Sequence, residues 1–353
     1  MNNTSKATIM PGAIPAASPT TRSQRTSFSA LALFIVALIV FPLIAPTYWV
    51  YFLAILGINI VACHGLNITM GYTGLLSLGH AAFMGVGAYT AALSQIHFSI
   101  PFWLGIPLAG AVAAVVGIAF GLPSLRIRGL YVVIATLAAQ FLLMFVFVHW
   151  QSVTNGDVGL NIAPAEIFGF QLNTDVRAYY LILFAVIAST LFAANVIKSR
   201  VGRAFIAVRE RDLTAEVLGV RLVQYKLLAF ALGSFYAGVA GGLMVYFNKY
   251  LTPEQFSLTV SVFFLSAIIV GGQGTILGGI LGAVFMTLVP EVLRLSLLFV
   301  GDSFGVNTAS ILVPLRETIF GVLIVGFLIF EPRGLAHIWR KMHAAYSTRR
   351  TTG

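Results

Sequence analysis

The chain has 353 residues, of which 59% are hydrophobic and only 9% are charged, so it is more apolar than a soluble domain needs to fill its core. The formal net charge is +10, but no basic, aromatic-interleaved soluble segment carries it, which excludes a nucleic-acid-binding domain. The single cysteine, Cys63, lies in an apolar run and can form no intramolecular disulfide. The composition predicts an integral membrane protein of the all-α class.

Residues 1–27 are rich in Ser, Thr and Pro, and have too little apolar content to pack. We expect a disordered cytoplasmic arm here, whose role and true start site stay open. A cleaved signal peptide is the alternative interpretation. The apolar run 28–45 is longer than the roughly 7–15 residues of a signal core, which favours a retained first span.

Runs of about 20 apolar residues are long enough to cross the bilayer as helices. The runs are continuously apolar and lack the alternation of lipid-facing strands, so helices are favoured over a barrel. The third and ninth runs are rich in glycine, and we expect broken or re-entrant segments there. The sequence predicts a membrane domain over 28–335 and a basic cytoplasmic tail over 336–353. The ten predicted spans are 28–45, 48–69, 74–96, 101–122, 129–150, 177–198, 226–247, 256–272, 275–297 and 314–330.

The orientation follows from the positions of Lys and Arg, which gather on the cytoplasmic side of membrane proteins. With ten spans and an internal N-terminus, all but four of the 21 basic residues fall in inner segments. The exceptions are Arg177, Lys249, Arg294 and Arg316. Both termini and the loop 199–225 are therefore expected in the cytoplasm. The longest outer loop, 151–176, has the Asn, Gly, Asp and Pro content of an ordered, turn-rich connection.

Seven charges crowd into residues 202–222, GRAFIAVRERDLTAEVLGVRL. Asp212 is a suitable N-cap for a short helix, and Gly219 is a stop signal. An inner loop that obeys the charge bias is one interpretation. A docking surface for another protein is the other, because acidic residues contribute little to topology. The acidic residues are Glu210, Asp212 and Glu216, and an apolar stripe at helical spacing accompanies them at Leu213, Val217 and Val220.

Two segments concentrate glycine, at 67–93 and at 270–285. Three glycines of the second segment follow three of the first by 200 positions, which is either a parallel internal repeat or chance in a glycine-rich chain. Small residues that let helices approach closely are one explanation. Turns that interrupt the membrane and line a polar path are the other. The candidates for such a path are Asn67, Gly71, Thr73, Gly74, Ser77, Gly79, His80, Gly271, Gln273 and Gly274.

His80 titrates nearest neutral pH among these residues, and it is read either as a hydrogen-bonded packing residue or as a proton carrier. Elsewhere in the spans charge is scarce, and Glu291 and Arg294 are spaced to pair with each other. This scarcity argues against an ion-coupled carrier, which stays the second hypothesis. A membrane enzyme that uses Ser77 and His80 is the third, without the GxSxG context.

No lysine follows a glycine, so a phosphate-binding P-loop is not expected, and the six histidines show no metal-binding spacing. The sequence predicts no catalytic residue, metal or cofactor.

The chain resembles the permease subunits of bacterial ABC importers of the branched-chain amino acid (LivM-like) family, and is similar also to urea ABC permeases. The motifs that carry the likeness follow one another in that family's order over nearly the whole chain after the N-terminal arm. They are GLLSLGHAAFMGVGAY at 74–89, SLRIRGLYVVIATLA at 124–138, TNGDVGL at 154–160, the segment from Gly202 to Met244, VGGQGTILGGILGAV at 270–284 and EPRGL at 331–335. The arm 1–27 departs from the family pattern.

The resemblance implies a transport subunit of the bacterial inner membrane that works by alternating access. Its implied partners are two cytoplasmic ATPase subunits, a second homologous permease subunit, a periplasmic substrate-binding protein and membrane lipid, with no nucleic acid. The loop 199–225 resembles a coupling helix that inserts into the ATPase subunit. Branched-chain amino acids are the implied substrate, with urea, short amides and other small carboxylates as alternatives. The coupling residues are Arg209, Glu210, Asp212, Leu213, Ala215, Glu216, Val217 and Gly219.

Overall fold

The computed structural model describes two compact units that divide after Pro46. In the first unit, residues 36–44 form a helix. The predicted arm 1–27 and residues 28–35 of the first predicted span lie outside the described residues, as does most of the tail. The second unit, from Thr47 onward, holds all the elements named below. The described residues are 36–124, 131–164, 166–167, 170–171, 174–304, 318–322, 324–327, 329 and 334–341.

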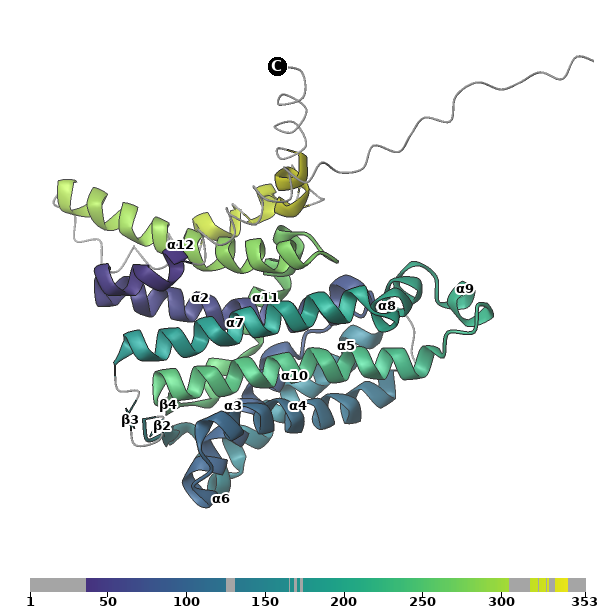
Figure 1. Cartoon of the computed structure of the whole chain (residues 1–353), viewed down its shortest axis with the longest axis horizontal. Helices are drawn as coiled ribbons and strands as arrows, with labels where there is room; N and C mark the ends of the chain where they lie inside the picture. Colours follow the sequence, from purple (N-terminus) through teal and green to yellow (C-terminus); the bar gives the residue numbers. More distant parts are fainter. Residues whose placement is uncertain are drawn as a thin grey trace, which may run out of the picture. The chain divides into compact units, whose positions relative to one another are not determined.

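Long helices dominate the second unit, and many of them run side by side (Figure 1). In chain order they are α2 (Thr47–Leu66), α3 (His80–Phe98), α4 (Phe102–Ser124), α5 (Tyr131–His149), α7 (Asp175–Lys198), α10 (Leu222–Asn248), α11 (Leu258–Gly271) and α12 (Ile276–Phe304). Shorter elements connect them. These are the π-helix η1 (Asn67–Tyr72), α6 (Gln151–Thr154), the 3₁₀ turns η2 (Gly156–Val158) and η3 (Pro253–Phe256), α8 (Arg200–Glu210), α9 (Asp212–Val217), and the two-residue strands β1 (Leu160–Asn161), β2 (Glu166–Ile167), β3 (Phe170–Gln171) and β4 (Tyr250–Leu251).

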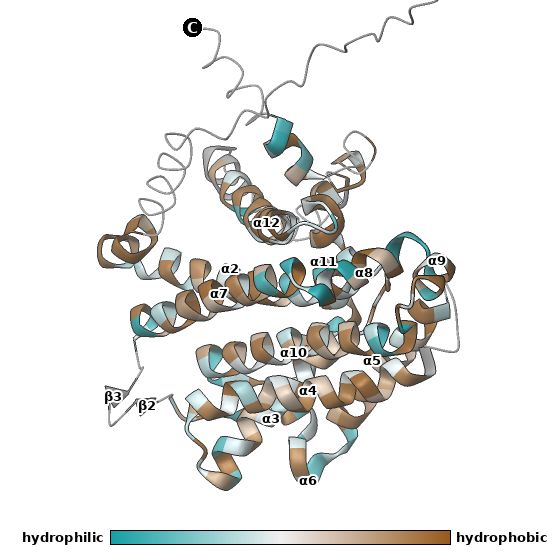
Figure 2. Ribbon diagram, turned by 45° about the vertical axis from the view of Figure 1, so that its right-hand side comes forward, coloured by the Kyte–Doolittle hydropathy of each residue, from teal (hydrophilic) through white to brown (hydrophobic). Residues whose placement is uncertain are grey.

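Seven helices among the described residues are long and apolar enough to cross a membrane. They are Thr47–Tyr72, Phe102–Leu122, Tyr131–His149, Asp175–Lys198, Leu222–Asn248, Pro253–Gly271 and Ile276–Ser296. Each coincides with a predicted span, so the prediction of a multi-pass, all-α membrane protein is confirmed. Figure 2 shows how hydrophobic residues cover these helices, while hydrophilic ones gather around α8 and α9.

The third predicted span, 74–96, for which a broken or re-entrant segment was expected, is helical over only part of its length. Its helix, α3, begins only at His80, and residues 73–79 have no helical structure. Helix α3 carries polar residues and glycines, and it is not among the seven helices that are long and apolar enough to cross a membrane. Of the tenth predicted span, only parts are described, and these are helical at 318–322 and 324–327. The count of ten helices therefore stays a prediction.

Helix α10 packs against α2, α3 and α4 in the centre of the unit. The close approach depends on glycine, because a Cβ at Gly87 of α3 would lie 2.3 Å from the Cα atom of Gly238 in α10. A Cβ at Gly238 would in turn lie 2.5 Å from the carbonyl oxygen of Ala109 in α4. No real Cβ fits at such distances, so these glycines set the spacing of three neighbouring helices.

One end of this bundle, which we call the strand end, is closed by backbone pairing between two loops. Strand β1 pairs antiparallel with β4, with Leu160 opposite Leu251. The Tyr250 hydroxyl also donates to the carbonyl oxygen of Val158 at 2.9 Å. The turn before β1 has Asn155 at φ 58°, a left-handed conformation that asparagine tolerates. A second small hairpin, β2 with β3, follows. The described part of the loop 151–176 is thus ordered and rich in turns, as predicted.

Candidate functional site

Each of the two glycine-rich segments contains a break between two long helices. In the first, α2 continues into the π-helix η1, which ends at Tyr72, and the chain then turns at Gly74 with φ +74°. In the second, α11 ends at Gly271, and Gly274 has φ +73° just before α12 begins. These positive φ angles favour glycine. We call residues 71–79 the first glycine break and residues 271–275 the second.

Asn67 joins the two breaks. Its Nδ2 donates to the carbonyl oxygen of Thr275 at 2.8 Å, and its Oδ1 accepts from the backbone N–H of Gly274 at 3.0 Å. A Cβ at Gly71 would lie 1.9 Å from that Oδ1 and 2.6 Å from the Gly274 nitrogen, so only glycine fits there. Segments 200 residues apart in the sequence are therefore in direct backbone contact.

The last described part of the chain also reaches the second break. Gly334 has φ +76°, and a Cβ on it would lie 2.6 Å from the Cα of Gly272. The chain then continues as a helix over 335–341, in which Ala336 is buried. Part of the EPRGL motif thus packs on the backbone of the second break.

Helix α3 begins deep in the protein, and its first backbone donors are used by side chains of α5 and α11. The Ala81 N–H donates to Ser261 Oγ at 2.9 Å, and the Ala82 N–H donates to Gln140 Oε1 at 3.0 Å. Gln140, which is fully buried, also donates from Nε2 to the carbonyl oxygen of Phe256 at 2.7 Å. Two of the donors that a buried helix start leaves without an intrahelical partner are thereby satisfied.

His80 lies at that helix start and is buried. Its Nε2 donates to the carbonyl oxygen of Ala62 at 2.9 Å, and its ring meets the Phe264 ring edge-on with the centroids 5.7 Å apart. Ala62 is ten residues before the end of η1, which corresponds to about 15 Å at the α-helical rise. Residues 73–79 therefore turn back alongside α2. His80 has the geometry of a buried, hydrogen-bonded packing residue.

The other polar residues predicted for a path are mostly buried as well. Thr73 donates from Oγ1 to the carbonyl oxygen of Ile68 at 3.2 Å, and Ser77 Oγ accepts from the Gly79 N–H at 3.4 Å. Gln273, in contrast, is exposed. The sequence interpretation missed Gln140 and Ser261. The available signal was the presence of these polar residues inside apolar spans, where an internal partner is required.

The second part of the site is the hairpin of α8 and α9, at the opposite end of the bundle from the strands. Ser199 caps α8, because its Oγ accepts from the Val201 N–H at 3.1 Å. Helix α8 is amphipathic and buries Phe205 and Val208 against the bundle. Its last turn carries Arg209, whose Nη1 donates to the carbonyl oxygen of Gly71 at 2.5 Å. The hairpin is therefore bonded to the first glycine break.

The predicted N-cap at Asp212 is wrong in its detail. Helix α9 begins at Asp212 itself, so Arg211 occupies the cap position and makes no side-chain capping bond. The Asp212 carboxylate instead pairs with Lys226 of α10, with Oδ2 and Nζ 2.5 Å apart. A charged ammonium is a stronger partner for a carboxylate than a backbone N–H.

Gly219 ends α9, as predicted. It has φ +85°, and its N–H donates to the carbonyl oxygen of Glu216 at 2.9 Å. The Val220 N–H donates to the carbonyl oxygen of Ala215 at 3.0 Å. These two bonds form a Schellman motif, which satisfies the last carbonyls of the helix.

Large apolar side chains are exposed at the tip of the hairpin. Leu213 is 63% exposed, Val217 88% and Leu218 75%, whereas Ala215 is 1% exposed. The predicted stripe of Leu213, Val217 and Val220 is corrected at its third member. Val220 turns back as part of the helix stop, and Leu218 lies on the exposed surface instead. We call Leu213, Val217 and Leu218 the apolar tip.

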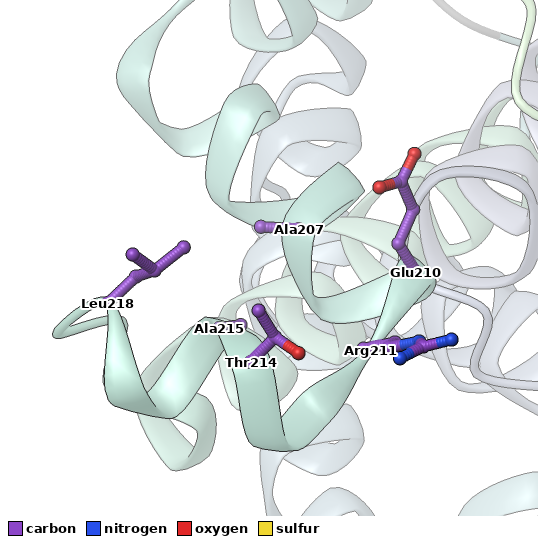
Figure 3. Close-up of a pocket in the computed structure, with 6 residues that line it drawn as sticks. All are labelled: Ala207, Glu210, Arg211, Thr214, Ala215 and Leu218. Atoms are coloured by element: carbon purple, nitrogen blue, oxygen red, sulfur yellow. The ribbon is translucent and has the colours of Figure 1, made fainter.

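A hollow of about 220 Å³ lies between α8 and α9 (Figure 3). Charged residues at its edge, Glu210 and Arg211, are exposed, and Glu216 of α9 is exposed as well. Apolar side chains beside charges of both signs are typical of protein interfaces. The residues that line the hollow are Ala207, Glu210, Arg211, Thr214, Ala215 and Leu218.

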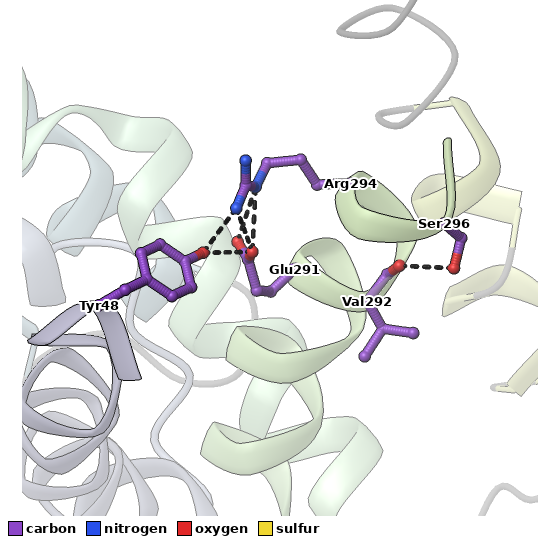
Figure 4. A network of polar contacts seen from close by, with 5 residues as sticks. All are labelled: Tyr48, Glu291, Val292, Arg294 and Ser296. Atoms are coloured by element: carbon purple, nitrogen blue, oxygen red, sulfur yellow. Dashed lines mark hydrogen bonds and ion pairs between the residues drawn. The ribbon is translucent and has the colours of Figure 1, made fainter. Parts of the chain in front are cut away.

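Glu291 and Arg294 form the predicted pair on α12, with Arg294 Nη2 2.6 Å from Glu291 Oε1. Tyr48 of α2 completes the cluster, because its hydroxyl donates to the Glu291 carboxylate and lies 2.7 Å from Arg294 Nη2 (Figure 4). The three side chains link α2 to α12 and neutralise the charges within one group.

No group of three or more potential metal ligands occurs among the described residues.

Comparison with known proteins identifies the family. The family described as "Branched-chain amino acid transport system / permease component" matches residues 48–328. The chain belongs to this family. The match includes both glycine breaks and the α8–α9 hairpin, so the features described above are parts of a transport permease component. The resemblance inferred from the sequence motifs is confirmed.

Several curated relatives are similar over most of the chain. The high-affinity branched-chain amino acid transport system permease protein LivM of Salmonella typhimurium is 30% identical, covering 80% of this chain and 68% of the relative. The Escherichia coli protein of the same name is 29% identical, covering 87% and 75%. The autoinducer 2 import system permease protein LsrC of Salmonella paratyphi B is 24% identical, covering 65% and 63%. No solved structure matches the chain.

Proposed function

We propose that the protein is the membrane-spanning permease subunit of an ATP-driven importer that moves branched-chain amino acids from the periplasm to the cytoplasm of a bacterial cell. The family match over residues 48–328 carries this proposal. The LivM relatives support the substrate class. The similarity to an autoinducer 2 permease indicates that related permeases serve other solutes, so urea, short amides and small carboxylates are the competing substrates.

The α8–α9 hairpin is proposed to face the cytoplasm. Seven basic residues occur from Lys198 to Lys226 inclusive, around this hairpin, and positive charge favours the cytoplasmic side. Both termini are then cytoplasmic and the strand end is periplasmic, where a substrate-binding protein would deliver its ligand.

The apolar tip is proposed to insert into a groove on a cytoplasmic ATPase subunit. Burial of Leu213, Val217 and Leu218 would supply affinity, and the exposed Glu210 and Glu216 would set the orientation of docking. Helix α9 is held in place by the ion pair of Asp212 with Lys226, by the burial of Ala215 and by the helix stop at Gly219. Two ATPase subunits and a second homologous permease subunit complete the proposed assembly. ATP-driven closure of the ATPases would then switch the membrane helices between outward-open and inward-open states.

The substrate path is proposed to run along the two glycine breaks. Exposed Gln273 supplies a side-chain donor and acceptor for an amino acid zwitterion. The buried Asn67, Thr73, Ser77 and His80 hold the shape of the breaks through bonds inside the protein. Their proposed role is therefore positional, while Gln273 is the side chain available to a solute.

Reconstitution of the complex tests the function. The chain is purified with its candidate ATPase, and uptake of leucine, isoleucine and valine is measured in proteoliposomes with ATP and the binding protein. Val217→Asp should reduce retention of the ATPase at least tenfold, because a carboxylate would enter an apolar interface. Val223→Asp is the matched control, because Val223 is also exposed but lies on α10 outside the tip.

Three results would contradict the proposal. Uphill transport by the chain alone would identify an ion-coupled carrier. If Val217→Asp and Val223→Asp reduced retention of the ATPase equally, the apolar tip would not be part of the interface with the ATPase. Uptake of urea or acetamide without uptake of branched-chain amino acids would change the substrate.

A further inference from the structure

Arg209 extends from the hairpin into the space that the glycines of both breaks leave open. Its Nη1 donates to the Gly71 carbonyl oxygen at 2.5 Å. A Cβ at Gly74 would lie 3.3 Å from Arg209 Cγ, and a Cβ at Gly274 would lie 2.4 Å from Arg209 Nη1. The side-chain stem therefore lies against the first break, and the guanidinium lies beside the second.

The Gly71 carbonyl is a suitable acceptor because it lies in the last turn of a helix, where carbonyl groups have no intrahelical partner. The two carbonyl groups that precede it in the chain accept hydrogen bonds from backbone N–H groups. Thr69 O accepts from the Leu75 N–H at 3.0 Å, and Met70 O accepts from the Gly74 N–H at 3.1 Å. Gly71 O instead receives a cation, which the negative end of a helix dipole also favours.

The contact continues from the first break to the second. Asn67 bonds to Gly274 and Thr275, and the backbone of Gly71 lies against that of Gly274. A displacement of Arg209 would therefore act on the junction between α11 and α12 as well as on the end of η1. Arg209 is in the last turn of α8, whose N-terminus is capped by Ser199, and the single residue Arg211 separates α8 from α9.

We propose that Arg209 is the positioning residue that transmits movement of the α8–α9 hairpin to both glycine breaks. Arg209 was expected to bind the ATPase, but its guanidinium bonds to the Gly71 carbonyl at the end of η1 in its own chain. The inference rests on the proposed function, in which the hairpin is moved by an ATPase. It assigns docking to the apolar tip and transmission to Arg209.

The test separates docking from transmission. In the reconstituted complex, ATPase retention, ATP hydrolysis stimulated by the loaded binding protein, and uptake per ATP hydrolysed are measured for each variant. Arg209→Met removes the donor and the charge but keeps an apolar stem against Gly74. Arg203→Ala is the matched control on the same helix, since Arg203 is exposed, as Arg209 is, but its Nη1 donates at 3.5 Å to Lys198 O and not to Gly71 O.

We expect Arg209→Met to retain the ATPase within twofold of the native chain and to lower uptake per ATP at least tenfold. Arg209→Lys should recover part of the loss, because an ammonium can still donate to Gly71 O but lacks the planar fork. Asn67→Ala should also lower uptake per ATP, and Arg203→Ala should match the native chain. If Arg209→Met is not recovered folded, Arg209→Gln replaces it under the same criteria.

Two outcomes would overturn the inference. If Arg209→Met kept uptake per ATP within twofold of the native chain, the bond between Arg209 and Gly71 would not transmit movement of the hairpin. Loss of ATPase retention in step with uptake would make Arg209 a docking residue. These outcomes differ from a failure of the proposed function, in which the native chain itself would not bind the ATPase or accumulate solute.

Discussion

Asp212 and Lys226 form an ion pair between residues 14 positions apart, with Oδ2 and Nζ 2.5 Å apart. The pair fixes the start of α9 to the beginning of α10, and both side chains are largely shielded from solvent, at 12% exposure for Lys226 and 31% for Asp212. A helix of six residues is too short to be stable by itself. The orientation of the apolar tip therefore depends on this pair and on the burial of Ala215.

Asp212→Asn should loosen the hairpin. A loss of about 1 kcal/mol, typical of a partly shielded pair, corresponds to a roughly fivefold larger population of the open form. Amide hydrogen exchange over residues 212–220 should be faster by about that factor, with exchange in α10 beyond its first turns unchanged. The reciprocal variant Asp212→Lys with Lys226→Asp should recover most of the protection. Equal exchange in Asp212→Asn and the native chain would show that burial alone holds α9.

Gly71 and Gly219 should respond very differently to alanine. At Gly219 no atom lies within 4 Å of a Cβ, so Gly219→Ala brings only the strain of positive φ, about 1–2 kcal/mol. At Gly71 the Cβ would overlap Asn67 Oδ1 and the Gly274 backbone. Thermal unfolding of the purified chain should therefore occur at a much lower temperature for Gly71→Ala than for Gly219→Ala. Similar melting of both variants would contradict the packing of the two breaks.

Gln140→Leu should destabilise the fold although it replaces a polar side chain with an apolar one. It leaves the Ala82 N–H and the Phe256 carbonyl without their side-chain partner, and each such loss costs about 1–3 kcal/mol. The measurement is thermal unfolding in detergent, with Gln151→Leu as the control at an exposed position of α6. A native melting temperature for Gln140→Leu would show that Gln140 does not support the start of α3.

Arg294→Gln should be more damaging than the double change Arg294→Gln with Glu291→Gln. The single change removes the cation that neutralises the Glu291 carboxylate, whereas the double change removes both charges. The yield of folded protein after membrane extraction and its melting temperature should rank native first, the double variant next and the single variant last. A single variant as stable as the double would indicate that water or lipid already neutralises Glu291.

Much of the fold was predictable because the physics of the spans is local. A run such as 101–122 must form a helix in lipid, and only its ends are uncertain. A broken segment was expected in the run 74–96, but its position at 73–79 was not predictable, because it depends on tertiary contacts. Residues 74–79 are apolar enough to read as helix, yet α3 begins only at His80, where α5 and α11 supply partners for its backbone.

The candidate site was predictable in its location but not in its contacts. The charges of 202–222 indicated a hairpin, and Gly219 indicated where its helix ends. The direction in which each side chain points depends on contacts with residues from distant segments. Arg209 meets Gly71, and Asp212 meets Lys226, and no spacing within the loop encodes these pairs. Likewise, the 200-residue offset identified similar glycine segments but not their mutual contact.

Four segments distant in the sequence meet around the second glycine break: Gly71 from η1, Arg209 from α8, Gly274 before α12, and Gly334 near the end of the described chain. Second-site suppressors of a defect at any one of the four positions should be found at the other three, although up to 263 residues separate them along the chain.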